Sequence, residues 1–163
     1  MNRLTHILFA AAVVLLGACS FEEQNPHSED IAALRELINI PIEAKSARWD
    51  IFRTPETGSR GIPGPDDFTT LIAELDHEQD WYSSLKEPPG KTFIVPEAAR
   101  PWLTKEFHEL LERNKNSWTN LASQGDCRKY ATSVAKSGRI VDGFACKAAG
   151  RILLYLTLDS HLP

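Results

Sequence analysis

The chain has 163 residues, of which 42% are hydrophobic and 25% are charged. This is the composition of one ordinary globular domain, and it excludes a disordered or largely membrane-embedded chain. The formal net charge of −4 excludes nucleic acid as a partner, because binding to phosphates needs an excess of basic side chains.

The first 18 residues follow the pattern of a secretory leader. A cationic residue, Arg3, precedes an apolar stretch over residues 7–16, and small residues follow it. The apolar stretch is about ten residues long, shorter than the roughly 20 that a membrane-spanning helix needs. We therefore expect residues 1–18 to be a signal peptide that is removed.

The leader ends in Leu16-Gly17-Ala18-Cys19. This segment resembles the lipobox of bacterial lipoproteins, in which a small residue precedes a Cys that is acylated and becomes the mature N-terminus. The resemblance implies that Cys19 carries lipid and binds the bilayer through it, each buried methylene contributing about 0.8 kcal/mol. In Gram-negative members of this class an Asp after the Cys favours the inner membrane. Because Ser20 stands there, the resemblance implies the outer membrane, facing the periplasm.

Residues 19–29 are polar after the lipidated Cys and are predicted to be a tether. Residues 30–163 are predicted to form a single periplasmic domain. Apolar residues at helical spacing predict that this domain begins with a helix, capped by Ser28 and stopped by Pro41.

A β-hairpin is predicted next. Alternating apolar and polar residues indicate strands over 47–52 and 68–75, joined across the Gly- and Pro-rich loop 54–67. A loop of this length is uncommon without a role, so it is a candidate partner-binding surface. The loop residues proposed to contact a partner are Arg60, Ile62 and Asp66.

The middle of the domain is predicted to be mixed. Asp76 and Gln79 fit a capping box, which predicts a helix over 76–86. A short strand over 92–95 and a helix over 104–114 follow. The sequence leaves residues 116–124 unassigned, with one helical turn around Trp118 and Leu121 as a candidate.

If Cys19 carries lipid, Cys127 and Cys146 remain as an even pair in an oxidising compartment, where a disulfide is expected. Apolar alternation on both sides of Gly138 indicates two strands joined by a tight turn, which would place the two Cys residues nearly opposite each other. A helix over 126–137, ended by Gly138, is the competing interpretation.

The last strand is predicted over 151–158, with Ile152, Leu154 and Leu156 on one face. So apolar a strand belongs in the centre of a sheet. Grouped helices and consecutive antiparallel strands predict an α+β fold. We expect an antiparallel sheet that ends in a three-stranded C-terminal meander, with the helices packed on one face.

No motif specifies a reaction or predicts a cofactor. The acidic cluster Asp76–Asp80 has the spacing of a calcium loop, but Trp81 stands where that loop needs Gly, so no metal is predicted. The segment Gly58–Asp67 lacks the Lys-Ser/Thr pair of a phosphate loop. No motif frames a catalytic nucleophile.

Arg100 and Trp102 flank Pro101 and are proposed as an exposed partner contact. The anchor, the acidic balance and the lack of a catalytic motif favour a non-enzymatic protein that binds an envelope or periplasmic protein, as an inhibitor, an immunity protein or an accessory of an envelope assembly. The alternative is an envelope enzyme or small-ligand carrier, with its site near the Gly58–Asp67 loop and the Asp76–Asp80 cluster.

Overall fold

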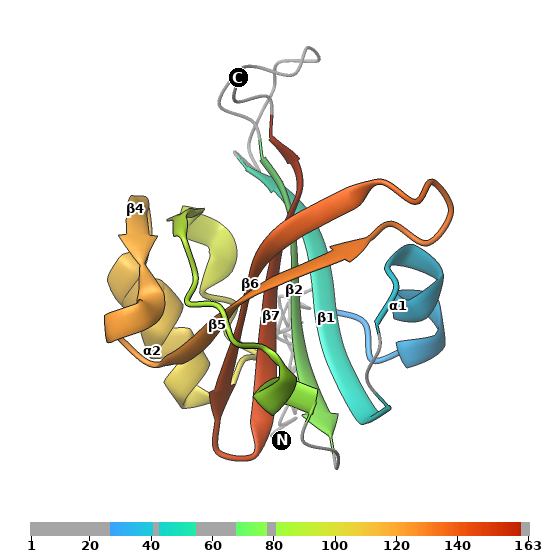
Figure 1. Ribbon diagram of the computed structural model, residues 1–163, viewed down its shortest axis with the longest axis horizontal. Coiled ribbons are helices and arrows are strands. Elements are labelled where there is room, and N and C mark those ends of the chain that lie inside the picture. The colour runs from blue at the N-terminus through green and yellow to red at the C-terminus, as the bar shows by residue number, and fades with distance from the viewer. Residues whose placement is uncertain (1–26, 41–42, 55–67, 78–80, 161–163) are drawn as a thin grey trace, which may run out of the picture.

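The computed structural model describes residues 27–40, 43–54, 68–77 and 81–160. Within these ranges the chain forms two α-helices, seven strands and three short 3-10 helices (Figure 1). In chain order they are α1 (Ile31–Leu37), β1 (Ala44–Thr54), β2 (Phe68–His77), η1 (Trp81–Ser84), β3 (Lys91–Ile94), η2 (Pro96–Ala98), α2 (Lys105–Asn114), β4 (Ser117–Asn120), η3 (Leu121–Ser123), β5 (Asp126–Ser133), β6 (Ile140–Ala148) and β7 (Arg151–Ser160).

Five strands form one antiparallel sheet in the order β1-β2-β7-β6-β5. The α+β class, the hairpin of β1 with β2 and the C-terminal meander are as predicted. β7 is the central strand, which agrees with its apolar sequence. The short strands β3 and β4 pair with each other in a separate two-stranded sheet, beside the meander in Figure 1.

Both faces of the five-stranded sheet are buried. On β7, Ile152 and Leu154 belong to a core cluster that includes Leu34 of α1, and this side is called the α1 face. Tyr155 belongs to a second cluster with Phe107 of α2, on the α2 face. The prediction that the helices pack on one face is therefore wrong. A central strand that is apolar on both sides needs a cover on each, and one helix lies on each face.

The segment before β1 joins the two edges of the sheet. Ser28 pairs with Trp49 of β1, while Ile38 pairs with Val134, just beyond β5. The α1 helix lies between these two bridges, next to the tip of the β5–β6 hairpin in Figure 1. Its N-cap is Asp30 rather than Ser28. The segment covers parts of both edge strands, which would otherwise present unpaired backbone groups.

The disulfide between Cys127 and Cys146 is present, with a sulfur–sulfur distance of 2.02 Å. The two residues are direct partners in the β5–β6 register, and Gly138 in the turn has a φ of 68°. The prediction of a strand, a turn and a strand is confirmed, and the competing helix over 126–137 is wrong. The cross-strand pairing holds this segment extended.

Two local predictions are corrected by strand pairing. The helix predicted over 76–86 is absent from its described residues, because β2 runs on to His77 and Asp76 pairs with Arg151 of β7. Only the short η1 follows. In the second case, the helical turn considered around Trp118 and Leu121 is divided: Trp118 lies in β4, where it pairs with Phe93 of β3, and only Leu121 begins a short helical turn, η3. Tertiary partners override local propensity at both places.

Candidate functional site

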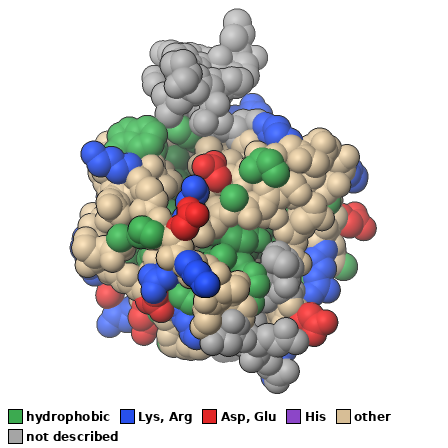
Figure 2. All heavy atoms as spheres, viewed as in Figure 1, with side chains coloured by type: hydrophobic (Ala, Val, Ile, Leu, Met, Phe, Trp, Pro, Cys, Tyr) green, Lys and Arg blue, Asp and Glu red, His purple; other side chains and the backbone are tan. Residues whose placement is uncertain are grey.

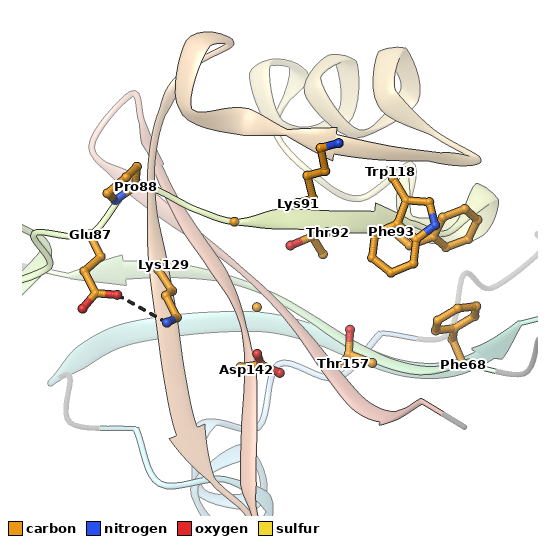
Figure 3. Close-up of a pocket in the computed structure, with 12 residues that line it drawn as sticks. Phe68, Glu87, Pro88, Lys91, Thr92, Phe93, Trp118, Lys129, Asp142 and Thr157 are labelled. Atoms are coloured by element: carbon orange, nitrogen blue, oxygen red, sulfur yellow. Dashed lines mark ion pairs between the residues drawn. The ribbon is translucent and has the colours of Figure 1, made fainter. Parts of the chain in front are cut away.

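A groove of about 460 Å³ lies between the β3–β4 sheet and the meander (Figure 3). One wall comes from β3, β4 and the segment before β3, and the floor comes from β6 and β7. Figure 2 shows acidic and basic side chains beside each other around a hollow in which hydrophobic side chains are visible. The groove is lined by Phe68, Glu87, Pro88, Gly90, Lys91, Thr92, Phe93, Trp118, Lys129, Asp142, Gly143 and Thr157.

A row of three aromatic rings stands at one end of the groove. The rings of Phe68 and Phe93 are stacked, with centroids 5.2 Å apart, and the ring of Trp118 lies 5.8 Å from that of Phe93. The register of β3 with β4 sets Phe93 directly opposite Trp118. Trp118 ends the row and is 58% exposed. An exposed indole supported by two further rings is a ready contact surface.

Tyr155 of the central strand fixes the position of β3. Its hydroxyl donates to the carbonyl oxygen of Phe93 at 2.8 Å and accepts from the Val95 N–H at 3.2 Å. Its ring stacks on Phe144, with centroids 4.9 Å apart. Burial raises the pKa of Tyr155 to about 12, so the hydroxyl keeps its proton for the bond to Phe93. The aromatic wall is thereby tied to the middle of the sheet.

The other end of the groove is polar. Lys129 forms an ion pair with Glu87 at 3.3 Å, and its backbone N–H donates to the carbonyl oxygen of Glu87. Lys91 and Asp142 also line the groove, and within the described part of the chain neither side chain has an ion-pair or hydrogen-bond partner. Figure 3 shows Asp142 on the floor, below β3. One acidic and one basic side chain are thus available to a ligand.

Gly143 shapes the floor. A Cβ atom added there would lie 1.9 Å from the carbonyl oxygen of Tyr155. The close approach of β6 to β7 at this point therefore requires a residue without a side chain. Sequence reasoning missed this residue, because Gly143 stands inside a predicted strand and its spatial neighbour Tyr155 is distant in the chain.

The predicted contact at Arg100 and Trp102 is not exposed. Arg100 forms an ion pair with Asp50 at 3.0 Å and lies 4.1 Å above the ring of Phe52. Trp102 is only 8% exposed and its ring stacks on that of His27. The prediction of an exposed aromatic at Trp102 is therefore wrong, because this segment packs on β1. Trp118 is the exposed tryptophan of the described residues.

The other predicted site residues fall mainly outside the described ranges. This applies to Cys19, to residues 78–80 of the acidic cluster, and to the three loop residues Arg60, Ile62 and Asp66. Across the residues that are described, no group of three or more His, Cys, Asp or Glu side chains could hold a metal ion. The same residues contain no helix long and apolar enough to cross a membrane.

Glu74 is a buried acid away from the groove. It is fully buried and accepts hydrogen bonds from Arg48 at 2.7 Å and Arg151 at 3.0 Å. Its second oxygen accepts from the N–H of Thr104, which caps α2. A buried carboxylate whose two oxygens both accept hydrogen bonds has a structural role, holding the segments that donate to it, rather than a reactive one.

No known protein family, curated protein or solved structure matches this chain.

Proposed function

We propose that the protein is a lipid-anchored, non-catalytic binding protein of the bacterial cell envelope. In this proposal acylated Cys19 holds it at the outer membrane, and the domain binds an envelope or periplasmic protein as an inhibitor, an immunity protein or an assembly accessory. The lipobox-like segment supports the anchor. The disulfide between Cys127 and Cys146 is consistent with an oxidising compartment.

The exposed ring of Trp118 is the observation that carries the binding role. Tryptophan is strongly enriched among residues that dominate binding energy, and Trp118 is exposed beside a groove at the end of a row of three aromatic rings. Of the groove-lining residues that the structure describes, none is Ser, Cys or His. The lining supplies an aromatic surface for stacking and side chains for hydrogen bonding, which supports a binding role.

The anchor would keep this surface close to the membrane. A fully extended chain from Cys19 to His27 spans at most about 28 Å. His27 is already held against the domain by the ring of Trp102. The domain can thus meet partners only within a short distance of the bilayer.

Two measurements test this proposal. Mass spectrometry of the native protein should find acyl chains on Cys19 and no residues before it. Affinity capture with the tagged full chain, after cross-linking in intact envelopes, should recover one protein in stoichiometric amount. The same capture should succeed with Ile140→Ala, which alters an exposed residue that does not line the groove, and fail with Trp118→Ala. An unacylated chain would contradict the lipid anchor at Cys19. Equal capture with and without the Trp118 side chain would contradict the proposed binding surface.

The composition of the groove favours a second candidate, a ligand-binding role in place of a protein contact. The centre of a protein interface is desolvated and depleted of charge. Lys91 and Asp142, by contrast, line the groove, and their side chains have no partners in the described residues. Covering them with a protein would bury two charges, which is costly unless each is paired. A small, well-hydrated ligand avoids that cost.

A further inference from the structure

We propose that the groove binds one pyranose ring of a glycan, with the apolar face of the sugar stacked on Trp118. This inference rests on the second candidate above, in which the groove is a ligand site, and adds the chemical class of the ligand. It is argued from the shape of the aromatic row, the polar groups around it, the charge of the lining and the size of the groove.

The aromatic row is a platform rather than a cage. The rings of Phe68 and Phe93 are inclined by only 23° with centroids 5.2 Å apart, so nothing fits between them. The free surface is the outward side of Trp118. The C–H groups on one face of a pyranose carry partial positive charge and suit the negative face of an indole ring. A cationic ligand also favours such a face, but the lining has two lysines for its two acids and so offers no net negative charge to attract it.

The polar groups around the platform match sugar hydroxyls. Each hydroxyl of a sugar can donate one hydrogen bond and accept others, as the hydroxyls of Ser and Thr do. The groove offers a donor at Lys91, an acceptor at Asp142, and groups that do both at Thr92 and Thr157. In the described chain these four side chains make no hydrogen bond or ion pair to other residues. Their full hydrogen-bonding capacity is free for a polyhydroxylated ligand.

The charge of the lining excludes a polyanion. The negative charges of Glu87 and Asp142 balance the positive charges of Lys91 and Lys129. Glu87 already forms an ion pair with Lys129. A nucleic acid or another phosphate polymer requires an excess of cations along its path. A neutral ligand is the best match to a lining whose charges cancel.

The size of the groove suits one or a few sugar rings. Its volume of about 460 Å³ falls in the range of about 300–1,000 Å³ that is typical of small-ligand sites. Trp118, Lys91 and Asp142 are all exposed. An open groove with an exposed stacking residue allows a ring to bind while the remainder of an oligosaccharide continues into solvent.

The test uses the full chain, purified in a detergent that has no sugar head group. Chitotriose, cellotriose and maltotriose are titrated separately by calorimetry and by tryptophan fluorescence. We expect at least one of them to bind, with an affinity that changes little as salt is raised, because the ligand is neutral. Trp118→Ala should weaken binding about tenfold or more, since it removes the stacking face. Trp118→Phe, which keeps a ring, should retain most of the affinity.

Matched variants separate this inference from its alternatives. Ile140→Ala, outside the groove lining, should bind the sugar as the unmodified chain does. Asp142→Asn keeps a hydrogen-bonding group and should bind more tightly than Asp142→Ala. The inference is overturned if none of the three trisaccharides binds at concentrations up to about 10 mM, or if Trp118→Ala binds equally well. Protein capture that depends on Trp118 without sugar binding would also overturn it, while leaving the proposed protein-binding function intact.

Discussion

The carboxylate of Glu74 joins three parts of the chain that are far apart in sequence. Through Arg48, Arg151 and the N–H of Thr104 it connects β1, β7 and the start of α2 to β2. Burying a charge is expensive unless it is paired and fully hydrogen-bonded. Glu74 meets that condition, so its removal should cost more than the loss of one surface ion pair.

We predict that Glu74→Gln lowers the free energy of unfolding by about 2–3 kcal/mol, because the two arginines lose their charged partner. The value lies at the lower end for buried pairs, since both arginine side chains remain about a third exposed and are solvated there. Urea denaturation measures the change. Glu109→Gln, on the exposed face of α2, is the control and should change the free energy by less than about 0.5 kcal/mol. If the two substitutions lowered the free energy of unfolding equally, the claim that the Glu74 carboxylate holds these segments together would be wrong.

Gly143 carries a second prediction at the residue scale. Gly143→Ala places a methyl group where the carbonyl oxygen of Tyr155 lies, 1.9 Å away, so β6 and β7 must separate. We expect a loss of about 2–4 kcal/mol or more in the free energy of unfolding, measured by thermal or urea denaturation. Gly90→Ala is the matched control, because a Cβ at that groove residue meets nothing within 4 Å. A Gly143→Ala protein as stable as the unmodified chain would show that the strands adjust freely.

At the scale of elements, the β5–β6 hairpin is closed by its disulfide near one end and by its turn at the other. Cys127 and Cys146 are both buried and stand directly opposite each other. Lys129 and Asp142 of the groove lie on the same two strands. The cross-link therefore constrains the element that carries part of the candidate site.

Reduction of this disulfide should lower the free energy of unfolding by about 3 kcal/mol, the chain-entropy value for a loop of about 20 residues. Urea denaturation with and without a reducing agent measures the difference. A double variant, Cys127→Ala with Cys146→Ala, serves as the control and should be insensitive to the reducing agent. If the unmodified chain were equally indifferent, the disulfide would contribute nothing to stability.

At the scale of the whole molecule, all three tyrosines of the chain are buried. They lie in η1, β5 and β7, as Tyr82, Tyr130 and Tyr155. Burial is the largest cause that raises the pKa of each above its ordinary value of 10.0, and the pKa of Tyr155 reaches about 12. In the unfolded chain the same hydroxyls ionise near their ordinary pKa. The folded state therefore holds protons that the unfolded state releases.

This difference predicts alkaline unfolding with a defined sign. The contribution of Tyr155 is complete below pH 10 and is lost as the pH rises through about 12, and the raised pKa values of Tyr82 and Tyr130 act in the same direction. Between the pKa of the unfolded chain and that of the folded protein, each tyrosine lowers the free energy of unfolding by at most about 1.4 kcal/mol per pH unit. Tyrosinate absorbance, followed with circular dichroism, should rise only as the fold is lost. Tyr155→Phe should make the pH dependence shallower. Ionisation of the tyrosine hydroxyls near pH 10 while the circular dichroism remains that of the folded protein would contradict this prediction.

Elements with a strong local pattern were predictable from the sequence alone. The alternation in β1, β2 and β7 and the helical spacing in α2 reflect how each segment buries one or both faces. The pairing of Cys127 with Cys146 was predicted from the even pair that remains if Cys19 is acylated, supported by the turn at Gly138, and the register of β5 with β6 excludes the competing helix over 126–137. The helix predicted near Asp76 failed because a capping-box pattern is a local signal, and the pairing of β2 with β7 outweighs it.

The amino-acid sequence by itself determined the α+β class, the C-terminal meander and the disulfide, because periodicity and turn residues act over short distances along the chain. Only the tertiary structure decided where the groove lies and which tryptophan is exposed. Trp102 follows Arg100-Pro101 after η2, and Trp118 follows Asn116-Ser117 and lies within β4. One is buried against β1 and the other stands beside Phe93 on the outside of a two-stranded sheet. That distinction depends on contacts between distant segments, and exposure is a property of packing rather than of local sequence.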